Sequence, residues 1–587
     1  MVIEIYDNYS ENLKKKNFFF WNCEKKSTKS IDFILDKNKI QIKKKYLSII
    51  EEIDSKNKKK NSHFFFKKIS LDELSLISEK NPFKSKDIYD CLKLLALEEF
   101  IKEKKIKKII YKGDSDKIKD SLNDLSYDLN FEYKKSIKKI EFNTKFVSIV
   151  RGIYFFYKFI LKNNKKINIS KNFSKITFFS YFLHFKKSNS NFYNSYLWDG
   201  LDEKLKKMKI NSNWMHFYVP SSQISNFKKA KEKLVRINEN NSEKHLLLNN
   251  QISNFKLLII FFKYLTLVLK NLLFMKDKEL LKNSISKTNF YYFLRQDINK
   301  SYYGEVLIYN LHMIATLDFV LSIMPKQKIG FYLLEGQSWE KCLNILWKKY
   351  NHKKLIGYLH STIRFWDLRY FKCKKEFDNN KNPDLFLFNG KYSKNIGIEN
   401  FYPSKKSKEV EALRYLHLIK KKIKKINKRN ILLIGDMNDY ENNYTLEQIA
   451  KVKNLFLKKT FYYKPHPSNT KKMINNLKVK YKFIKILEPL KEINLENYFK
   501  VICTNSTSAI LDCIIKKIDF CSIKSYSTLD LFPIDNKKID ERRVYSTEDL
   551  IKFIKNKKNK FIVQNYLNLS SNLENWKNII NYNYSNK

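Results

Sequence analysis

Arginine and glycine are scarce in this sequence of 587 residues. Only nine of its 115 basic residues are arginine, and it contains only ten glycines. Proteins that read nucleic-acid sequence rely on arginine for bidentate contacts to phosphates and bases, so the formal net charge of +55 does not indicate such a reader. Lysine with abundant Asn, Ile, Phe and Tyr is the residue set of A/T-rich codons. We interpret the charge as composition bias, with a role at anionic lipids or nucleotides as the alternative.

Paired cysteine motifs are absent as well. The seven cysteines show no CxxC spacing and no Cys/His ligand spacing, which argues against a structural zinc and for a reducing compartment. The first residues, MVIEIYDNYSENLKKK, lack the charged segment, apolar core and small-residue site of a secretory signal. The expected location is therefore the cytoplasm.

The most hydrophobic window, Ile252 to Phe274, is long enough to span a bilayer but is not free of charge. Lys256, Lys263 and Lys270 recur every seven residues on one helical face, and each costs roughly 2.5–3.5 kcal/mol at mid-bilayer. A spanning helix is disfavoured. The window predicts an amphipathic helix, which is either buried against the protein or lies at the inner face of the cytoplasmic membrane with its lysines toward anionic head groups.

Apolar residues are plentiful, at 43% of the chain with 15% aromatic, and the length indicates two to four domains. Residues 1–165 contain short strand-like pieces such as KKIIYKGD and predict a small α/β domain without recognisable chemistry. A second domain, 166–425, begins with the buried strand pattern that starts at Ile176. Trp198 and Trp214 in its aromatic segments are interpreted as core residues, with sugar stacking as the alternative.

After Pro325, short apolar strands alternate regularly with helices. The strands KIGFYLLEG, KLIGYLHS and PDLFLFNG come first, and the order recurs beyond the lysine-rich bridge 418–430 with NILLIGD, TFYYKPHP, KFIKILEP, KVICTNSTS and DFCSIKS. Continuous apolar strands joined by helices are typical of parallel sheets covered on both faces. The predicted fold class is α/β, with two facing Rossmann-like domains, 166–425 and 426–587, and an additional N-terminal α/β region.

Ligands bind beyond the carboxyl ends of parallel strands, so residues that follow the strands are candidates for a site. One candidate is His466 in the stretch KPHP, where Pro465 and Pro467 stiffen the backbone on both sides. A rigid imidazole there can donate to a phosphate or nucleotide oxygen at little ordering cost. The alternative is an ordinary turn histidine.

A second candidate is CTNSTSAILDCIIKK, in which a strand, a hydroxyl-rich loop and a helix follow one another. Free backbone N–H groups and hydroxyls at a helix start predict an anion site, while capping by Ser506 or Thr507 is the alternative. Lys464, His466 and helix dipoles are expected to meet the phosphate charge beside the Gly435 turn. No metal is expected, because Asp436 and Asp439 in GDMNDY are interpreted as solvated or helix-capping.

KPHP, followed about forty residues later by TNSTSAILDCI, resembles the His-Pro and Ser/Thr motifs of bacterial sialyltransferases and capsular Kdo transferases. The similarity covers about residues 326–535 and includes FCSIKSYSTLDLFP. It implies the two-domain GT-B architecture. It also implies that His466, with Lys464 and Pro467, binds the cytidine monophosphate part of a sugar donor. By the same resemblance, the donor phosphate is contacted by Ser506, Thr507 and Ser508.

The same superfamily carries an acidic-acidic-Gly motif after a strand of its N-terminal domain, and this chain has LLEGQSWE there. Glu335 precedes Gly336, whereas Leu334 replaces the first acid, so the match is partial. The resemblance implies that Glu335 is a general base for an acceptor hydroxyl; the alternative is a carboxylate that interacts with a helix dipole. Glu340, five residues on, is expected to support that site or to bind the acceptor.

The stretch GYLHSTIRFWD ends another predicted strand with His360, Ser361 and Arg364. These residue types suit an acidic sugar or a phosphate, and a hydrogen-bonded turn histidine is the alternative.

Together these features predict a glycosyltransferase of surface polysaccharide, lipopolysaccharide or capsule synthesis. It would transfer an acidic sugar from a CMP-sugar donor to a glycan or lipid-linked acceptor without metal or cofactor. The expected partners are donor, acceptor and anionic membrane, and no nucleic acid. A CDP-glycerol-type glycerophosphotransferase and a non-catalytic carbohydrate- or nucleotide-binding assembly protein are the alternatives.

Overall fold

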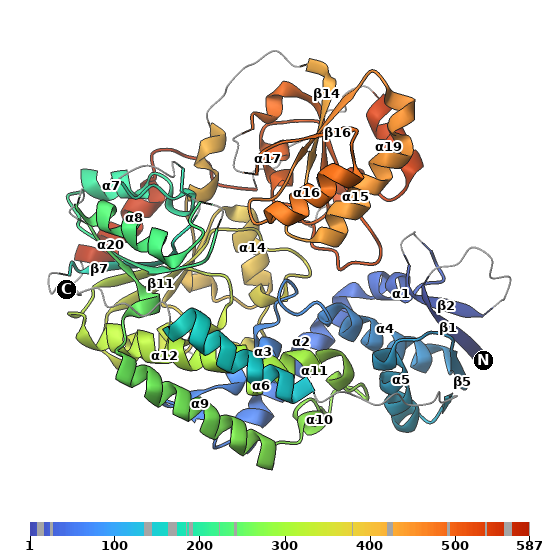
Figure 1. The fold of residues 1–587 in the computed structure, drawn as a ribbon, viewed down its shortest axis with the longest axis horizontal. Coiled ribbons are helices and arrows are strands. Elements are labelled where there is room, and N and C mark those ends of the chain that lie inside the picture. Colours follow the sequence, from blue (N-terminus) through green and yellow to red (C-terminus); the bar gives the residue numbers. More distant parts are fainter. Residues whose placement is uncertain are drawn as a thin grey trace.

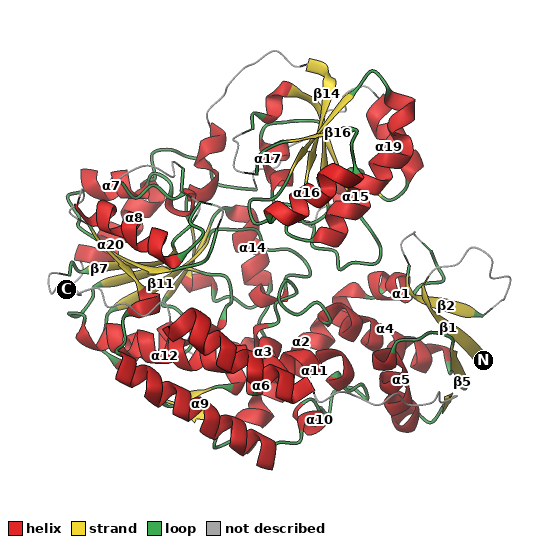
Figure 2. Ribbon diagram, viewed as in Figure 1, coloured by secondary structure: helices red, strands yellow, loops and turns green. Residues whose placement is uncertain are grey.

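The computed structural model describes residues 1–8, 17–23, 27–133, 144–161, 173–183, 185–186, 192–221, 223–239, 243–377, 380–419, 427–489, 493–534, 537–556 and 566–585. Within these ranges it contains three parallel sheets and a helical layer (Figures 1 and 2). Most of the lysine-rich bridge, residues 420–426, lies outside the described residues. The predicted fold class, an α/β protein with two Rossmann-like domains and an N-terminal α/β region, is confirmed.

The N-terminal sheet is small and entirely parallel, in the order β2-β1-β5-β6. Its strands are β1 (Val2–Asn8), β2 (Phe18–Asn22), β5 (Lys108–Tyr111) and β6 (Glu132–Tyr133). The helices of this region are α1 (Ile31–Lys37), α2 (Lys39–Lys60), the short α3 (Leu76–Glu79), α4 (Ile88–Lys104) and α5 (Asp116–Leu129). Helices α2 and α4 each bury an apolar face in a core that they share with the rest of the protein.

The middle sheet has seven parallel strands in the order β13-β12-β11-β10-β7-β8-β9. They are β7 (Ile176–Tyr181), β8 (Asn213–Phe217), β9 (Lys244–Leu247), β10 (Ile329–Leu333), β11 (Lys354–Leu359), β12 (Leu385–Phe388) and β13 (Ser407–Glu409). The central strands are mostly apolar, and they are buried except at Tyr181, the last residue of β7, and Lys354, the first residue of β11, as expected for a sheet covered on both faces. Strand order reverses between β7 and β10, which creates a crevice at their carboxyl ends.

The covering helices of the middle sheet include α8 (Phe227–Glu239), α13 (Ser338–Lys349) and α14 (Lys391–Glu399). Trp198 is 2% exposed and Trp214 is fully buried, and their indole N–H groups donate to Ser180 and Ser212. Both are core residues, so the sugar-stacking alternative is wrong for this pair.

A helical layer joins the N-terminal region to the middle sheet. It comprises α6 (Thr144–Phe155), α9 (Asn254–Phe274), α11 (Tyr291–Tyr302) and α12 (Glu305–Ile323). One continuous hydrophobic core includes residues of α2, α4, these helices and the middle sheet. The predicted boundary at residue 165 lies outside the described residues, but the core shows that the regions on its two sides pack together.

The C-terminal sheet has six parallel strands in the order β16-β15-β14-β17-β18-β19. They are β14 (Asn427–Ile434), β15 (Thr460–Lys464), β16 (Ile484–Ile486), β17 (Tyr498–Thr504), β18 (Phe520–Ile523) and β19 (Arg543–Val544). Its helices are α15 (Asp439–Val452), α16 (Lys471–Lys480), α17 (Ala509–Ile515) and α19 (Thr547–Lys555). Here the strand order reverses between β14 and β17, which makes a second crevice.

The last helix, α20 (Glu574–Ser585), returns to the middle sheet. Its Trp576 is fully buried in the same core as Phe331 and Tyr358, and the Trp576 indole donates to the Glu411 carbonyl. The predicted range 426–587 therefore includes a helix that belongs to the middle domain by its packing, because its apolar face is covered there.

Candidate active site

Three neighbouring strands of the middle sheet end on polar side chains that meet. Tyr181 is the last residue of β7, Glu335 follows β10, and His360 follows β11. The Nε2 of His360 lies 3.0 Å from one Glu335 carboxylate oxygen, and the Tyr181 hydroxyl lies 3.0 Å from the other. Because the strands are parallel and adjacent, their carboxyl ends bring these residues together at the crevice where strand order reverses.

Glu335 is held as a carboxylate. Burial raises its pKa, but the hydrogen bond from His360 and the positive charge of Arg369 outweigh burial and hold the pKa well below its usual range. Burial lowers the pKa of His360 although Glu335 opposes this, so the imidazole is neutral. Its Nδ1 lies 3.4 Å from Arg414 Nη1, which is a donor, so Nε2 carries the proton donated to Glu335.

The loop after β10 is fixed by Gly336 and Glu340. Gly336 has a φ of +71°, and a Cβ there would lie 2.6 Å from the Arg369 carbonyl oxygen, so only glycine fits. The Glu340 carboxylate accepts hydrogen bonds from the backbone N–H groups of Glu335, Gly336 and Gln337 at 2.9–3.2 Å. Burial raises the pKa of Glu340 to about 8, against the effect of these donors.

Both Glu340 oxygens thus bind the loop of Glu335, as expected for a residue that supports the site. Contact of Glu340 with an acceptor stays a prediction.

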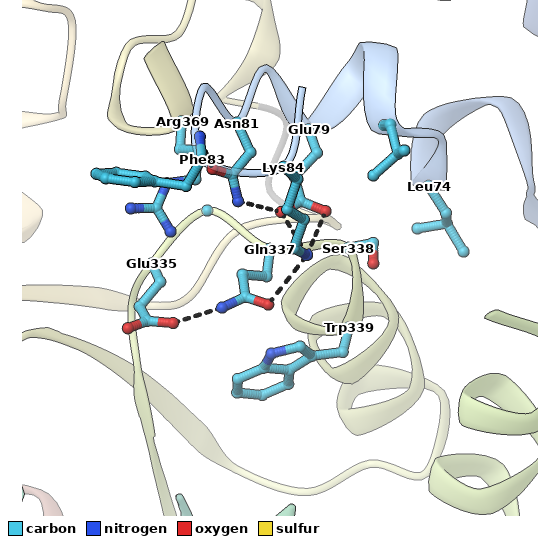
Figure 3. A network of polar contacts seen from close by, with 12 residues as sticks. Leu74, Glu79, Asn81, Phe83, Lys84, Glu335, Gln337, Ser338, Trp339 and Arg369 are labelled. Carbon is cyan, nitrogen blue, oxygen red and sulfur yellow. Dashed lines mark hydrogen bonds and ion pairs between the residues drawn. The ribbon is translucent and has the colours of Figure 1, made fainter. Parts of the chain in front are cut away.

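The N-terminal region contributes a loop to this place (Figure 3). Lys84 Nζ lies 3.5 Å from the Gln337 amide oxygen, and the Gln337 amide nitrogen donates to Glu335 and to the Tyr181 hydroxyl. The Phe83 ring lies 5.4 Å from the Arg369 guanidinium, within cation–π range. A loop of the N-terminal region, in which the sequence showed no chemistry, therefore forms one wall beside Glu335.

In the C-terminal domain, Asp436 and Ser506 meet at the crevice between β14 and β17. The Ser506 hydroxyl donates to the Asp436 carboxylate, which is 6% exposed and also accepts from the Asn438 N–H. Burial raises the pKa of Asp436, and the bond from Ser506 opposes this. Asp436 is therefore buried and paired, so the prediction that it is solvated or helix-capping is wrong.

The predicted hydroxyl cluster is dispersed. Thr507 is buried, its hydroxyl accepts from Ala509 N–H at 3.5 Å, and Ser508 precedes α17 without a side-chain cap bond. The Ser506 hydroxyl is already bonded to Asp436, and α17 has only seven residues. The structure does not test phosphate contact by this loop, which stays a prediction.

His466 sits in a tight turn after β15 that includes Pro467. Its backbone N–H donates to the Asn469 side chain, and the Asn469 N–H returns to the His466 carbonyl, both within 2.9 Å. Its Nδ1 lies 2.7 Å from the Ser468 hydroxyl and accepts from the Ser468 N–H. Burial and the charge of Arg414 lower the pKa of His466 to about 4, so the ring is neutral and Nε2 carries its proton.

Among the described residues, no group bonds His466 Nε2, so this N–H is free for a ligand.

Lys464 and Gly435, also predicted to bind the nucleotide of the sugar donor, make contacts within the protein, and their contact with a nucleotide stays a prediction. Lys464 Nζ donates to the Glu488 carbonyl at 2.8 Å. Gly435 donates its N–H to the Lys464 carbonyl, and a Cβ there would lie 2.3 Å from the Tyr463 hydroxyl oxygen. Gly435 thus permits close packing, and its N–H is used within the sheet.

Arg364 links the two Rossmann-like domains. Its Nη1 donates to the carbonyls of Ser506 at 2.5 Å and Leu531 at 2.9 Å, and the side chain is 8% exposed. It therefore holds the Ser506 loop against the middle domain. Contact of Arg364 with an acidic sugar or phosphate is not tested and stays a prediction. Ser361 accepts at its carbonyl from Asn389.

The functional residue that the sequence interpretation missed is Arg414, which connects the two crevices. It contacts His360 of the middle domain and is close enough to His466 of the C-terminal domain to lower that pKa. A signal was present in the composition, because three of the chain's nine arginines, Arg364, Arg369 and Arg414, gather here. In a chain that otherwise uses lysine, such use marks positions where a planar, permanently charged donor is needed.

Comparison with known proteins gives only distant structural likenesses. No protein-family model and no curated protein matches the chain. One similar structure is UDP-N-acetylglucosamine 2-epimerase from Rickettsia bellii, with 12% identity and a TM-score of 0.40 over 70% of this chain and 97% of that chain. A second is UDP-GlcNAc 2-epimerase from Neisseria meningitidis bound to UDP-GlcNAc, with 10% identity and a TM-score of 0.35 over 64% of this chain and 89% of that chain. A third is α,α-trehalose-phosphate synthase (UDP-forming) from Burkholderia vietnamiensis, with 6% identity and a TM-score of 0.35 over 66% of this chain and 92% of that chain.

At these scores the likenesses establish no shared activity. None of the three is a sialyltransferase or a Kdo transferase, so that resemblance rests on the motifs alone.

Proposed function

We propose that this protein is a glycosyltransferase that uses a nucleotide-activated sugar. The observation that carries the proposal is the position of Arg414, which contacts the Glu335–His360 pair of one domain and acts on His466 of the other. An ionised carboxylate and a free imidazole N–H suited to a phosphate thus belong to one charged region. Each follows a strand of a separate Rossmann-like sheet.

On the donor side, the nucleotide would lie on the C-terminal domain, with its phosphate at His466 Nε2–H. The fixed turn and the neutral ring favour this role, since the Nε2–H group is oriented before the nucleotide binds. Arg414 adds a permanent positive charge toward which negative charge develops as the nucleotide leaves. Ser506, Thr507 and Ser508 would line the phosphate once the Ser506 hydroxyl releases Asp436.

On the acceptor side, Glu335 would take the proton of an attacking hydroxyl. The acceptor oxygen forms a bond to the anomeric carbon while the bond from that carbon to the donor phosphate oxygen breaks. The phosphate keeps the electron pair, and the proton goes to Glu335. Glu335 is in the deprotonated state that this step requires, and His360, Tyr181 and Gln337 hold its position.

The finer proposal is a CMP-linked acidic sugar as donor and a growing glycan or lipid-linked glycan as acceptor, in surface carbohydrate synthesis at the cytoplasmic side. Two features support it: the KPHP and TNSTSAILDCI motifs, and the cationic Arg414, which suits a sugar carboxylate. The proposed reaction uses no metal, because Arg414 and His466 meet the charge of the leaving phosphate.

The test is a calorimetric binding screen of the full-length protein against CMP, CDP, UDP and GDP, followed by product analysis with the matching sugar donors. CMP should bind best, and a CMP-sugar should give a glycosidic product that also forms in excess EDTA. UDP or GDP binding ten times tighter than CMP would overturn the donor assignment. CMP binding without turnover of any donor would support the non-catalytic alternative, and a glycerophosphate product from CDP-glycerol would support the glycerophosphotransferase.

A further inference from the structure

Helices α6 and α9 lie side by side on α12, on the side of the middle sheet away from the C-terminal domain (Figure 1). The Tyr264 hydroxyl of α9 donates to the Ile149 carbonyl of α6, and the rings of Phe156 and Phe261 stack with centroids 4.7 Å apart. The inward stripe of α9 is buried and includes Leu257, Ile260 and Leu267. Both helices are thus packed against the protein on one side and against each other.

The outer face of α9 is apolar and exposed. Phe255, Ile259, Phe262, Leu269 and Leu273 follow one another at intervals of three, four or seven residues, which places them on a single stripe. Their exposed fractions range from 50% for Ile259 to 75% for Leu273. At 1.5 Å per residue this 21-residue helix presents an apolar ridge about 30 Å long.

The neighbouring helix extends this surface. Phe146, Val150 and Tyr154 of α6 and Tyr157 of the following turn are exposed by 48–65%. Soluble monomers rarely expose a contiguous apolar surface of this kind without a partner, because it costs hydration free energy. We therefore expect the exposed aromatic and aliphatic faces of these two adjacent helices to contact another molecule.

The charge around this face restricts the occupant. Neither α6 nor α9 contains an aspartate or glutamate. Lys256, Lys263 and Lys270 line one edge of the apolar stripe, about a quarter turn around the helix from its centre. An apolar ridge with a row of lysines at its edge matches the acyl region and the anionic head groups of a membrane surface.

We propose that α6 and α9 form a docking face for an anionic lipid bilayer, in which the outer stripe of α9 enters the head-group region. This proposal is independent of the proposed function. A second copy of the chain fits less well, since it would bring two rows of lysines together without intervening acids. The sequence interpretation placed the lysines at the membrane; the structure puts the apolar stripe at the centre and the lysines at its border.

The helix does not need to leave the protein for this contact. Two helices of the described residues are long and apolar enough to cross a membrane, α9 and α12. Most of the apolar window of α12 is buried, whereas that of α9 is only one third buried. Because α9 is packed along its inner stripe, it lies in the surface of the bilayer rather than across it.

The experiment is flotation of the full-length protein with phosphatidylglycerol-containing vesicles and with pure phosphatidylcholine vesicles. The test variant is Phe262→Glu with Leu273→Glu, and the matched control is Leu457→Glu with Val479→Glu, which changes two equally exposed apolar residues of the C-terminal domain. Wild type and control should float with the anionic vesicles, and the test variant should bind at least tenfold more weakly. Thermal melts establish that each variant is folded.

Wild-type protein that ignores vesicles, binds both vesicle types equally, or binds undiminished after the Phe262/Leu273 change would overturn the proposal. Sedimentation velocity identifies the rival occupant: a wild-type dimer that this double change converts to monomer, without vesicle binding by either protein, would assign the face to a second copy. Wild-type flotation that weakens in high salt, together with a monomer in solution, supports the lipid assignment.

Discussion

His360 donates from Nε2 to Glu335 and accepts at Nδ1 from Arg414, so a single imidazole connects the carboxylate to the arginine. The ring keeps one tautomer because each nitrogen has a fixed partner. The hydrogen bond from His360, together with the charge of Arg369, keeps Glu335 ionised. Acid–base chemistry and phosphate binding are therefore assigned to different residues, which makes the two roles separable by mutation.

Glu335→Gln should abolish transfer while sparing nucleotide binding. The amide keeps the shape of the side chain but cannot take a proton, so the transfer rate should fall roughly a hundredfold or more. Nucleotide affinity should change little, because Glu335 contacts the acceptor side. The measurements are transfer rate and CMP affinity, with Glu447→Gln, a surface glutamate of the C-terminal domain paired with Lys480, as control. Normal transfer by Glu335→Gln would remove Glu335 as the base.

His466→Ala should weaken nucleotide binding without unfolding the protein. It deletes the free Nε2–H, and a hydrogen bond to a charged phosphate is worth roughly 1.5–3 kcal/mol, about ten- to a hundredfold in affinity. The half-buried turn keeps its backbone hydrogen bonds with Asn469, so the melting temperature should change little. The exposed His417 supplies the control, His417→Ala. Equal CMP affinity in the two variants and the wild type would exclude His466 from the donor site.

The lowered pKa of His466 predicts a pH dependence of stability. The folded ring has a pKa of about 4, whereas an unperturbed histidine has a pKa of about 6.5. Between these values the unfolded chain binds a proton that the folded protein does not, so His466 reduces stability as the pH falls from 6.5 toward 4. His466→Gln removes this contribution. The free energy of unfolding in urea is measured for both proteins at pH 7.5 and pH 5.0. Relative to the wild type, the variant should be more stable at pH 5.0 than at pH 7.5. The same stability difference at both pH values would contradict the assigned burial of His466.

The fold was predictable from sequence because the strands from Ile329 onward are short, apolar and regularly separated by helices. Parallel pairing and burial on both faces follow from that pattern. The same logic placed Glu335 and His360 at strand ends. Their contact required knowledge of strand order, and the order could not be derived from periodicity. The return of α20 to the middle sheet was unpredictable for the same reason, since amphipathic spacing does not identify the surface that a helix covers.

Other parts of the site depend on contacts between residues far apart in the chain. The Ser506–Asp436 hydrogen bond joins residues seventy positions apart. From the local motif alone, the Ser506 hydroxyl was expected to be free for a ligand. Arg414 precedes residues that lack strand or helix signals, so no rule about strand ends applies to it. The available signal was that arginine is rare among the 115 basic residues of this chain. That signal was overlooked because the basic composition was interpreted as a bias of the whole sequence.

The loop of Phe83 and Lys84 should determine acceptor binding. It comes from the N-terminal region and lies beside Gln337 and Arg369, on the Glu335 side of the site (Figure 3). Phe83→Ala opens this wall and removes the aromatic face from Arg369, so the acceptor KM should rise about tenfold while CMP affinity stays the same. Tyr127→Ala, which removes a 74% exposed aromatic ring from the same region, is the control and should change neither quantity. A Phe83→Ala protein with a normal acceptor KM would leave the loop with a structural role alone, whereas a parallel loss of CMP affinity would place the loop at the donor instead.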